Sequence, residues 1–314
     1  MLRFIAKRLA FMALALVCVA LITFTLMQMA PGNFLDIQIL SSSLQTDVVS
    51  SRETIGRWEQ RYGLDQPKHI QFFRFMKGMV TLDLGPSFQY PSLDVEEIIQ
   101  KSFPVSLTLA VASVLVALII AIPLGILAAV KQNSLWDYVA MFISMVGNAI
   151  PAYVLAVFLM LLFTLKLRVL PSGGWSEPKH MIMPVLALSL TSVAGIARYM
   201  RSSMVETLRA DYIAAAWAKG GSFRNVVLNH ALRNSLIPLI TVVGPLLARL
   251  MVGTVFIESM FRIPGLGQYF AQAAANRDFP VLMTATVFFA FVIMTMNLIV
   301  DLLYGLLDPR IRYE

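Results

Sequence analysis

The sequence predicts an all-α integral membrane protein that crosses the bilayer six times. Of its 314 residues, 58% are hydrophobic and only 14% are charged, whereas soluble domains carry about 25% charged residues. The apolar residues also gather in long blocks, and several blocks reach the roughly 20 residues that a helix needs to cross about 30 Å of hydrocarbon. Composition and block length together therefore predict a chain that is embedded in a lipid bilayer.

Six apolar blocks are long enough to be spans. They occupy residues 9–30, 104–130, 139–165, 181–200, 236–257 and 281–306. The first block follows a basic N-terminus, as a secretory signal does, but it is longer than the about 7 to 15 apolar residues of such a signal. We therefore expect an uncleaved first span. Five prolines interrupt later blocks and predict kinked helices, with or without a solute pathway between them: Pro123, Pro151, Pro184, Pro238 and Pro245.

Lysines and arginines beside the spans predict the orientation. Six spans leave both termini on one side, where the short loops hold twelve such residues: Arg3, Lys7, Arg8, Lys131, Arg198, Arg201, Arg209, Lys219, Arg224, Arg233, Arg310 and Arg312. The short loops on the other side hold five: Lys166, Arg168, Lys179, Arg262 and Arg277. Positive charge concentrates on the cytoplasmic side, so we expect cytoplasmic termini. The orientation signal then accounts for the net charge of +7, and no nucleic acid is expected as a partner.

Residues 31–103 form the main polar segment and predict an external helical insertion between the first two spans. Apolar periodicity suggests three short helices, within 50–64, 67–85 and 91–103, with turn residues between them. The insertion could be a solvated loop without a particular role, or it could contact a partner or a gate.

A short stretch between the fourth and fifth spans, DYIAAAWAKGG at 211–221, predicts an isolated helix of about eight residues. Asp211 can cap its start, Lys219 suits the negative end of its dipole, and Gly220 stands where left-handed backbone usually ends a helix. So short a helix is unstable alone in water. It needs a surface on which to dock.

Tyr212, Ala215, Ala216 and Lys219 share one face of this helix, and the run Ala214 to Ala216 is small enough for another protein's backbone to approach closely. An ordinary loop helix would show the same chemistry. The residues are also similar to the Glu-Ala-Ala signature of ABC importer permeases, in which three residues separate this triplet from a Gly and nine more separate the Gly from Ile-x-Leu-Pro. Ala214 stands at the Glu position, and His230 to Arg233 replace the final motif.

These departures, with the run HALRNSLIP, resemble the B-type permease subunits of dipeptide and oligopeptide ABC importers. The resemblance covers nearly the whole chain and includes YGLDQP, LDLG, ESMFRIPGLGQYF, RDFP and a closing Asp-Pro-Arg. It implies one permease domain over 1–314 with the type I ABC importer fold, in a prokaryotic inner membrane. It also implies that the helix at 211–221 is a coupling helix, within a cytoplasmic loop at 201–235, that docks on an ATPase subunit.

The family further implies the partners: a second homologous permease, two ABC ATPase subunits and an external substrate-binding protein. The chain has no GxxxxGK[ST] phosphate loop, so ATP and Mg²⁺ are expected in the ATPase subunits and no cofactor in this chain. Three distant histidines and one cysteine predict no metal site. We expect a transport subunit rather than an enzyme, and the solute could be a dipeptide, a longer peptide, a nickel chelate or an oligosaccharide.

Two ionisable residues fall inside predicted spans, where charge is costly and usually faces a cavity or a partner. Asp301 stands where the family commonly has Asp, which favours a structural hydrogen bond or ion pair. Arg249 lies midway along the fifth span, where the family usually has a small or apolar residue. It could pair with Asp301, although the depths of the two residues match poorly, or it could attract the carboxylate of a solute in the translocation path.

Two other classes of protein compete with the importer subunit. A secondary transporter or channel would work without ATP, but the spans hold no acidic ion-coupling residue besides Asp301. A membrane-embedded enzyme would need a nucleophile or metal constellation that the sequence does not show. Co-purification with ATPase subunits would separate the importer from both.

Overall fold

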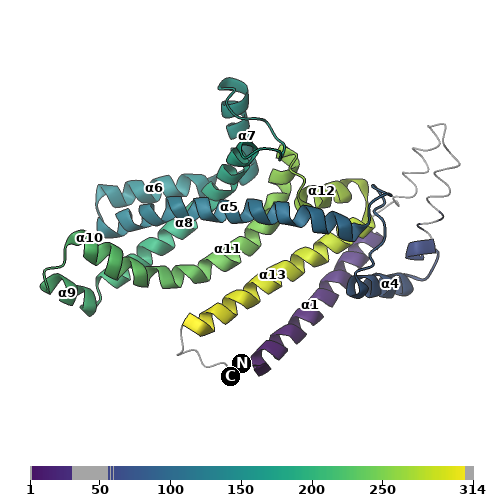
Figure 1. Ribbon diagram of the computed structural model, residues 1–314, viewed down its shortest axis with the longest axis horizontal. Helices are drawn as coiled ribbons and strands as arrows, with labels where there is room; N and C mark the ends of the chain where they lie inside the picture. The colour runs from purple at the N-terminus through teal and green to yellow at the C-terminus, as the bar shows by residue number, and fades with distance from the viewer. Residues whose placement is uncertain (1, 30–55, 57, 59, 308–314) are drawn as a thin grey trace. The chain divides into compact units, whose positions relative to one another are not determined.

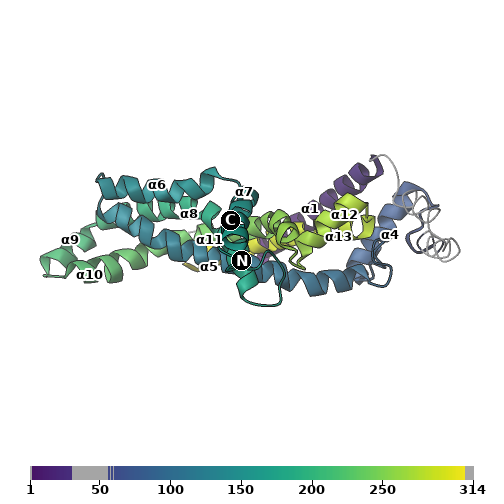
Figure 2. The same ribbon diagram turned by 90° about the horizontal axis from the view of Figure 1, so that it is seen from above.

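The computed structural model describes residues 2–29, 56, 58 and 60–307. Among these residues there is no β-strand, only one isolated bridge between Pro86 and Asp94. The chain divides into two compact units, one of Met1–Ser106 with Pro264–Met294 and the other of Leu107–Ile263 with Thr295–Glu314. Figures 1 and 2 show the helices that make up each unit.

The first unit contains α1 (Leu2–Met29), α4 (Lys68–Thr81), α12 (Leu266–Asn276), the first turns of α5 (Val95–Val130) and the first half of α13 (Phe279–Leu307). The helix predicted within 67–85 is confirmed as α4. The helix predicted within 91–103 is not a separate element, because it continues without a break into the second span as α5. Of the helix predicted within 50–64, Gly56, Trp58 and residues 60–62 are helical and residues 63–64 form a turn; the remaining residues lie outside the described part of the chain.

A buried carboxylate ties the segment between α4 and α5 to α13. Asp278 is 1% exposed and accepts hydrogen bonds from the Ser87 hydroxyl, from Phe88 N at 3.2 Å and from Gln89 N at 3.1 Å. It also accepts a longer bond from Val281 N at 3.4 Å, in the first turn of α13. Three backbone donors and a hydroxyl satisfy the charge, so this burial is tolerated.

Aromatic packing completes this junction. The rings of Trp58 and Phe88 lie 5.2 Å apart, as do those of Tyr62 and Phe88. The Tyr62 hydroxyl donates to Pro86 O at 2.5 Å or Leu84 O at 3.2 Å. Burial, followed by the charge of Asp278, raises the pKa of Tyr62, so it stays a neutral donor.

The second unit contains α6 (Leu135–Ala149), α7 (Ala152–Leu159), a π-helical segment (Met160–Lys166), α8 (Lys179–Leu208), α9 (Asp211–Ala218), α10 (Phe223–Asn225), a second π-helical segment (Val226–Ala231) and α11 (Leu232–Phe261), together with most of α5. Helix α8 is its centre, with buried residues along its length. A Cβ on Gly147 of α6 would lie 2.3 Å from Leu190 O, so glycine lets α6 and α8 approach closely.

Five described helices are long and apolar enough to cross a membrane, and a bent pair makes a sixth. That pair, α6 and α7 with its π-helical continuation, corresponds to the predicted span at 139–165 and is bent by 95°. The bend falls at Ile150 and Pro151, because proline locks φ and forces its predecessor into extended backbone. By contrast, Pro184, Pro238 and Pro245 lie inside continuous helices.

Candidate functional site

The predicted short helix at 211–221 is α9, and its two ends differ in how well they were predicted. Gly220 has the expected left-handed backbone, with φ +78°. Asp211 is not the cap: Ala210 occupies that position, and Asp211 is the first helical residue. Its carboxylate still lies in the first turn, where the helix dipole favours negative charge. Lys219 is the C-cap residue rather than part of the last turn.

The C-terminal end of α9 has two hydrogen bonds of the Schellman type. Gly220 N donates to Trp217 O at 2.9 Å, and Gly221 N donates to Ala216 O at 3.1 Å. Gly220 is needed for its conformation only, since a Cβ there would meet nothing within 4 Å. Gly221 is needed for space, because its Cβ would lie 2.8 Å from the Val226 side chain.

Helix α9 is held against the segment that begins the fifth span. Ile213 is fully buried, as is Val226 in the second π-helical segment. Asn234 Nδ2 donates to the Tyr212 hydroxyl at 2.8 Å. The helix that is too short to be stable alone is therefore docked on its own chain through one face. Figures 1 and 2 place α9 and α10 together at one end of this unit.

The outward face of α9 is flat and small. Ala214, Ala215 and Ala218 are exposed, and Trp217 borders them with 42% exposure. The predicted face also included Ala216, which is half-buried. Tyr212, with 45% exposure, and Lys219 remain accessible. Backbone atoms of another protein could approach the three alanines closely.

Hydrogen bonds join the ends of α8 and α11 beside α9. Ser203 Oγ donates to Ser235 O at 3.0 Å, and Ser235 Oγ lies 3.0 Å from Thr207 Oγ1. Ser235 is fully buried. A displacement of α9 would therefore act on two spans, through the chain on either side of it and through these bonds.

A bidentate ion pair fixes the same end of α8 to α6, and sequence reasoning missed it. Arg201 Nε lies 2.7 Å from Asp137 Oδ1, and its terminal nitrogen lies 2.5 Å from Oδ2. Asn133 N donates to Asp137 at 2.9 Å, and Asp137 is 3% exposed. The available signal was an isolated acidic residue at the start of an apolar helix. Such planar pairs hold both position and angle.

Arg249 lies on the exposed face of α11, together with Pro245, Val252, Gly253 and Phe256. These residues recur at helical spacing and form one continuous stripe. Within the part of the chain that the structure describes, no ion pair joins Arg249 to Asp301. The guanidinium therefore faces outward from this unit rather than into its core.

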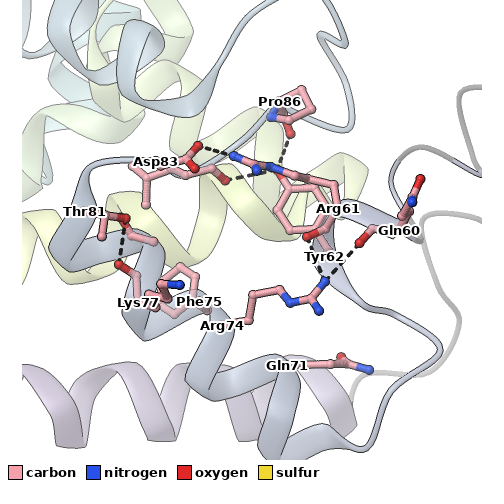
Figure 3. Close-up of a pocket in the computed structure, with 12 residues that line it drawn as sticks. Gln60, Arg61, Tyr62, Gln71, Arg74, Phe75, Lys77, Thr81, Asp83 and Pro86 are labelled. Carbon is pink, nitrogen blue, oxygen red and sulfur yellow. Dashed lines mark hydrogen bonds and ion pairs between the residues drawn. The ribbon is translucent and has the colours of Figure 1, made fainter.

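A cavity of about 670 Å³ is lined by residues between Gln60 and Pro86 (Figure 3). Arg74 Nη1 donates to Gln60 O at 3.0 Å and to Arg61 O at 3.1 Å, and Nη2 donates to Gln66 Oε1 at 3.1 Å. Arg61 pairs with Asp83. Both guanidinium groups are thus used to hold the walls of the cavity together.

The helical arrangement is that of the membrane subunits of type I ABC importers. A chain of the MetNI methionine ABC transporter in an inward-facing conformation matches with a TM-score of 0.58 and 18% identity, over 67% of this chain and 96% of that one. A chain of an amino acid ABC transporter crystallised with histidines matches with a TM-score of 0.51 and 14% identity, over 66% and 92%. At these identities the likeness shows the fold.

The chain belongs to the binding-protein-dependent transport system inner membrane components, whose family model matches residues 121–313. The N-terminal model of the same membrane components matches residues 1–110. The dipeptide transport system permease protein DppB of Bacillus subtilis is 39% identical over 99% of this chain and 98% of its own length. The oligopeptide transport system permease protein OppB of Haemophilus influenzae is 38% identical over the full length of both. The chain is thus a multi-pass membrane transport component.

Proposed function

We propose that this chain is the permease subunit of an ATP-driven importer for peptides or similar solutes, coupled to its ATPase through residues 211–221. One observation carries the coupling: α9 presents a small outward face while Ile213 and Tyr212 bind it to the chain beside α11. Full-length similarity to dipeptide and oligopeptide permeases supports the solute class.

In this mechanism the chain transmits force and performs no chemistry of its own. ATP and Mg²⁺ bind the partner ATPase subunits, whose closure displaces the docked α9. The displacement reaches α11 through Asn234 and Ser235, reaches α8 through Ser203, and passes from α8 to α6 through the Arg201 ion pair. The helix bundle then has two arrangements, and both the ATPase subunits and the solute-loaded binding protein shift the equilibrium between them. Because such coupling is reciprocal, solute delivery must in turn affect ATP hydrolysis.

The proposal includes the partners and the domain layout. One domain over 1–314 supplies half of a translocation path, with an external insertion at 31–103 and a cytoplasmic loop at 201–235. A second, homologous permease supplies the other half, facing the exposed stripe of α11 that carries Arg249. Two ABC ATPase subunits dock on the two coupling helices, and an external binding protein delivers the solute.

Co-purification tests this function. The full chain, expressed with its neighbouring genes and purified through a tag on the chain alone, should bring down an ABC ATPase. Vesicles containing the complex should take up peptide only when ATP and binding protein are both supplied. Uptake driven by an ion gradient in the absence of ATP would instead establish a secondary transporter.

The orientation in a prokaryotic inner membrane is a second proposal, supported by the excess of lysine and arginine near α9 and the termini. In a Cys18→Ala background, an impermeant maleimide added to intact spheroplasts should label Ser92→Cys, which is exposed in the turn before α5. It should label Ser222→Cys, beside α9, only after permeabilisation. Labelling of Ser222→Cys in intact spheroplasts would reverse the orientation and place α9 away from ATP.

A further inference from the structure

Helix α4 exposes a stripe of apolar side chains and buries a polar one. Its apolar residues Ile70, Phe73 and Val80 lie on one side and are 40%, 68% and 81% exposed. Its polar Gln71 is only 6% exposed and donates to Leu64 O at 3.0 Å and Gln66 O at 2.8 Å. A helix in water would show the opposite pattern, since an exposed apolar stripe marks a contact with another apolar medium.

The contact between α4 and α1 places this stripe at the edge of the bilayer. Phe72 of α4 packs edge to face against Phe24 of α1, with ring centroids 5.5 Å apart. Phe24 lies inside the candidate span Ile5–Met29, five residues from its end, a distance of about 7.5 Å along a helix. Helix α4 therefore lies beside the span, below the point where the span leaves the membrane.

The apolar surface of α1 beside the stripe is exposed as well. Only 6% of the most apolar stretch of Ile5–Met29 is buried within the chain, and Leu26, near Phe24, is 62% exposed. Lys77 lies within the stripe, between Phe73 and Val80, and Lys68 stands in the first turn of α4; both are exposed. Neither lysine forms an ion pair with a residue that the structure describes, so both are available to lipid phosphates.

We propose that α4 is an interfacial helix that lies flat on the outer leaflet, with Ile70, Phe73 and Val80 among the acyl chains and Lys68 and Lys77 among the phosphates. Such helices bury their apolar face about 5 to 10 Å into the boundary between headgroups and acyl chains. The buried polar side then carries the external segment, through Gln71 and Arg74. The insertion is thereby held at a fixed height above the bilayer.

Lipid quenching tests the proposal on the intact complex in nanodiscs of phosphatidylethanolamine and phosphatidylglycerol. An environment-sensitive fluorophore is attached to Val80→Cys in a Cys18→Ala background. Leu26→Cys on α1 serves as the lipid-facing reference. Ser92→Cys, exposed in the turn before α5, serves as the reference in water. Because α4 packs near the depth of Phe24, lipid that carries a nitroxide near the headgroup should quench Val80 to an extent similar to that of Leu26, while Ser92 stays nearly unquenched.

A matched pair of substitutions sharpens the result. Phe73→Asp should reduce lipid quenching at position 80, because a charge on the stripe opposes insertion, whereas Phe73→Leu should preserve it. Quenching at Val80 equal to that at Ser92 would overturn the proposal. So would a water-excluded signal at Val80 that nitroxide-labelled lipid does not quench, since protein would then cover the stripe. The measurement requires neither ATP nor solute, so its failure is distinct from a failure of the importer function.

Discussion

Replacing Ala215 by glutamate is expected to abolish stimulation of ATP hydrolysis by solute-loaded binding protein, while the chain still folds and inserts. Ala215 is exposed on the outward face of α9, so the longer side chain meets nothing within the chain itself. Against a partner's groove it would bury an unpaired charge, which costs several kcal/mol. Each 1.4 kcal/mol is about tenfold in affinity, so the ATPase should also dissociate during purification.

Gly220 gives an independent test of the same helix. Gly220→Val should uncouple the complex too, because a β-branched residue is strained in left-handed backbone by about 1 to 2 kcal/mol. Gly220→Asn should retain most activity, since Asn tolerates that conformation and no atom lies near the added Cβ. A strict need for glycine would indicate contact with the partner instead.

Ala275→Glu serves as the matched control for Ala215→Glu. Ala275 is an exposed alanine in α12, distant from α9 in sequence and in the other unit. It should leave retention of the ATPase unchanged. Normal stimulation and normal retention in both Ala215→Glu and Gly220→Val would reduce 211–221 to an ordinary loop helix.

Replacing Arg249 by alanine is expected to lower uptake of solutes with a free carboxylate by roughly tenfold or more, the value of one hydrogen bond to a charged group. Amidated analogues should lose much less. The reason is that Arg249 faces outward from α11 within an apolar stripe, where it can meet a solute anion at membrane depth. Uptake of paired free and amidated peptides into vesicles of the reconstituted importer measures the difference.

Arg249→Lys keeps the positive charge and should restore part of the preference for the free carboxylate. It should not restore all of it, because lysine does not form the two parallel bonds that arginine makes with a carboxylate. Equal losses for free and amidated peptides in Arg249→Ala would assign Arg249 a structural role, such as contact with the second permease.

Local pattern was sufficient to predict the spans and the turn at Gly220. An apolar block of about 20 residues favours helix whatever surrounds it, because no other local structure satisfies its backbone in lipid. The left-handed turn at Gly220 is equally local, since only the glycine backbone reaches it cheaply. Helix α9 was therefore predicted with nearly its observed bounds, Asp211–Ala218.

Whether a helix bends at a proline, by contrast, could not be predicted from the sequence. Of the prolines predicted to kink helices, Pro151 separates two helices by 95°, while Pro184 and Pro245 lie within unbroken ones. A proline in the sequence shows only that one backbone hydrogen bond of the helix is missing. Packing against neighbouring helices decides whether the chain continues or turns.

Contacts between distant residues depended on tertiary structure altogether. Sequence analysis counted Arg201 only among the basic residues that predict the orientation of the chain. In the fold, Arg201 pairs with Asp137, 64 residues away. Asp278 binds the Ser87 hydroxyl across 191 residues. The exposed apolar stripe of α4 likewise depended on tertiary structure, because periodicity identifies the two faces of a helix but not the medium that each face meets. A local pattern records preferences within a few turns, whereas partners across the chain are chosen by how whole helices pack.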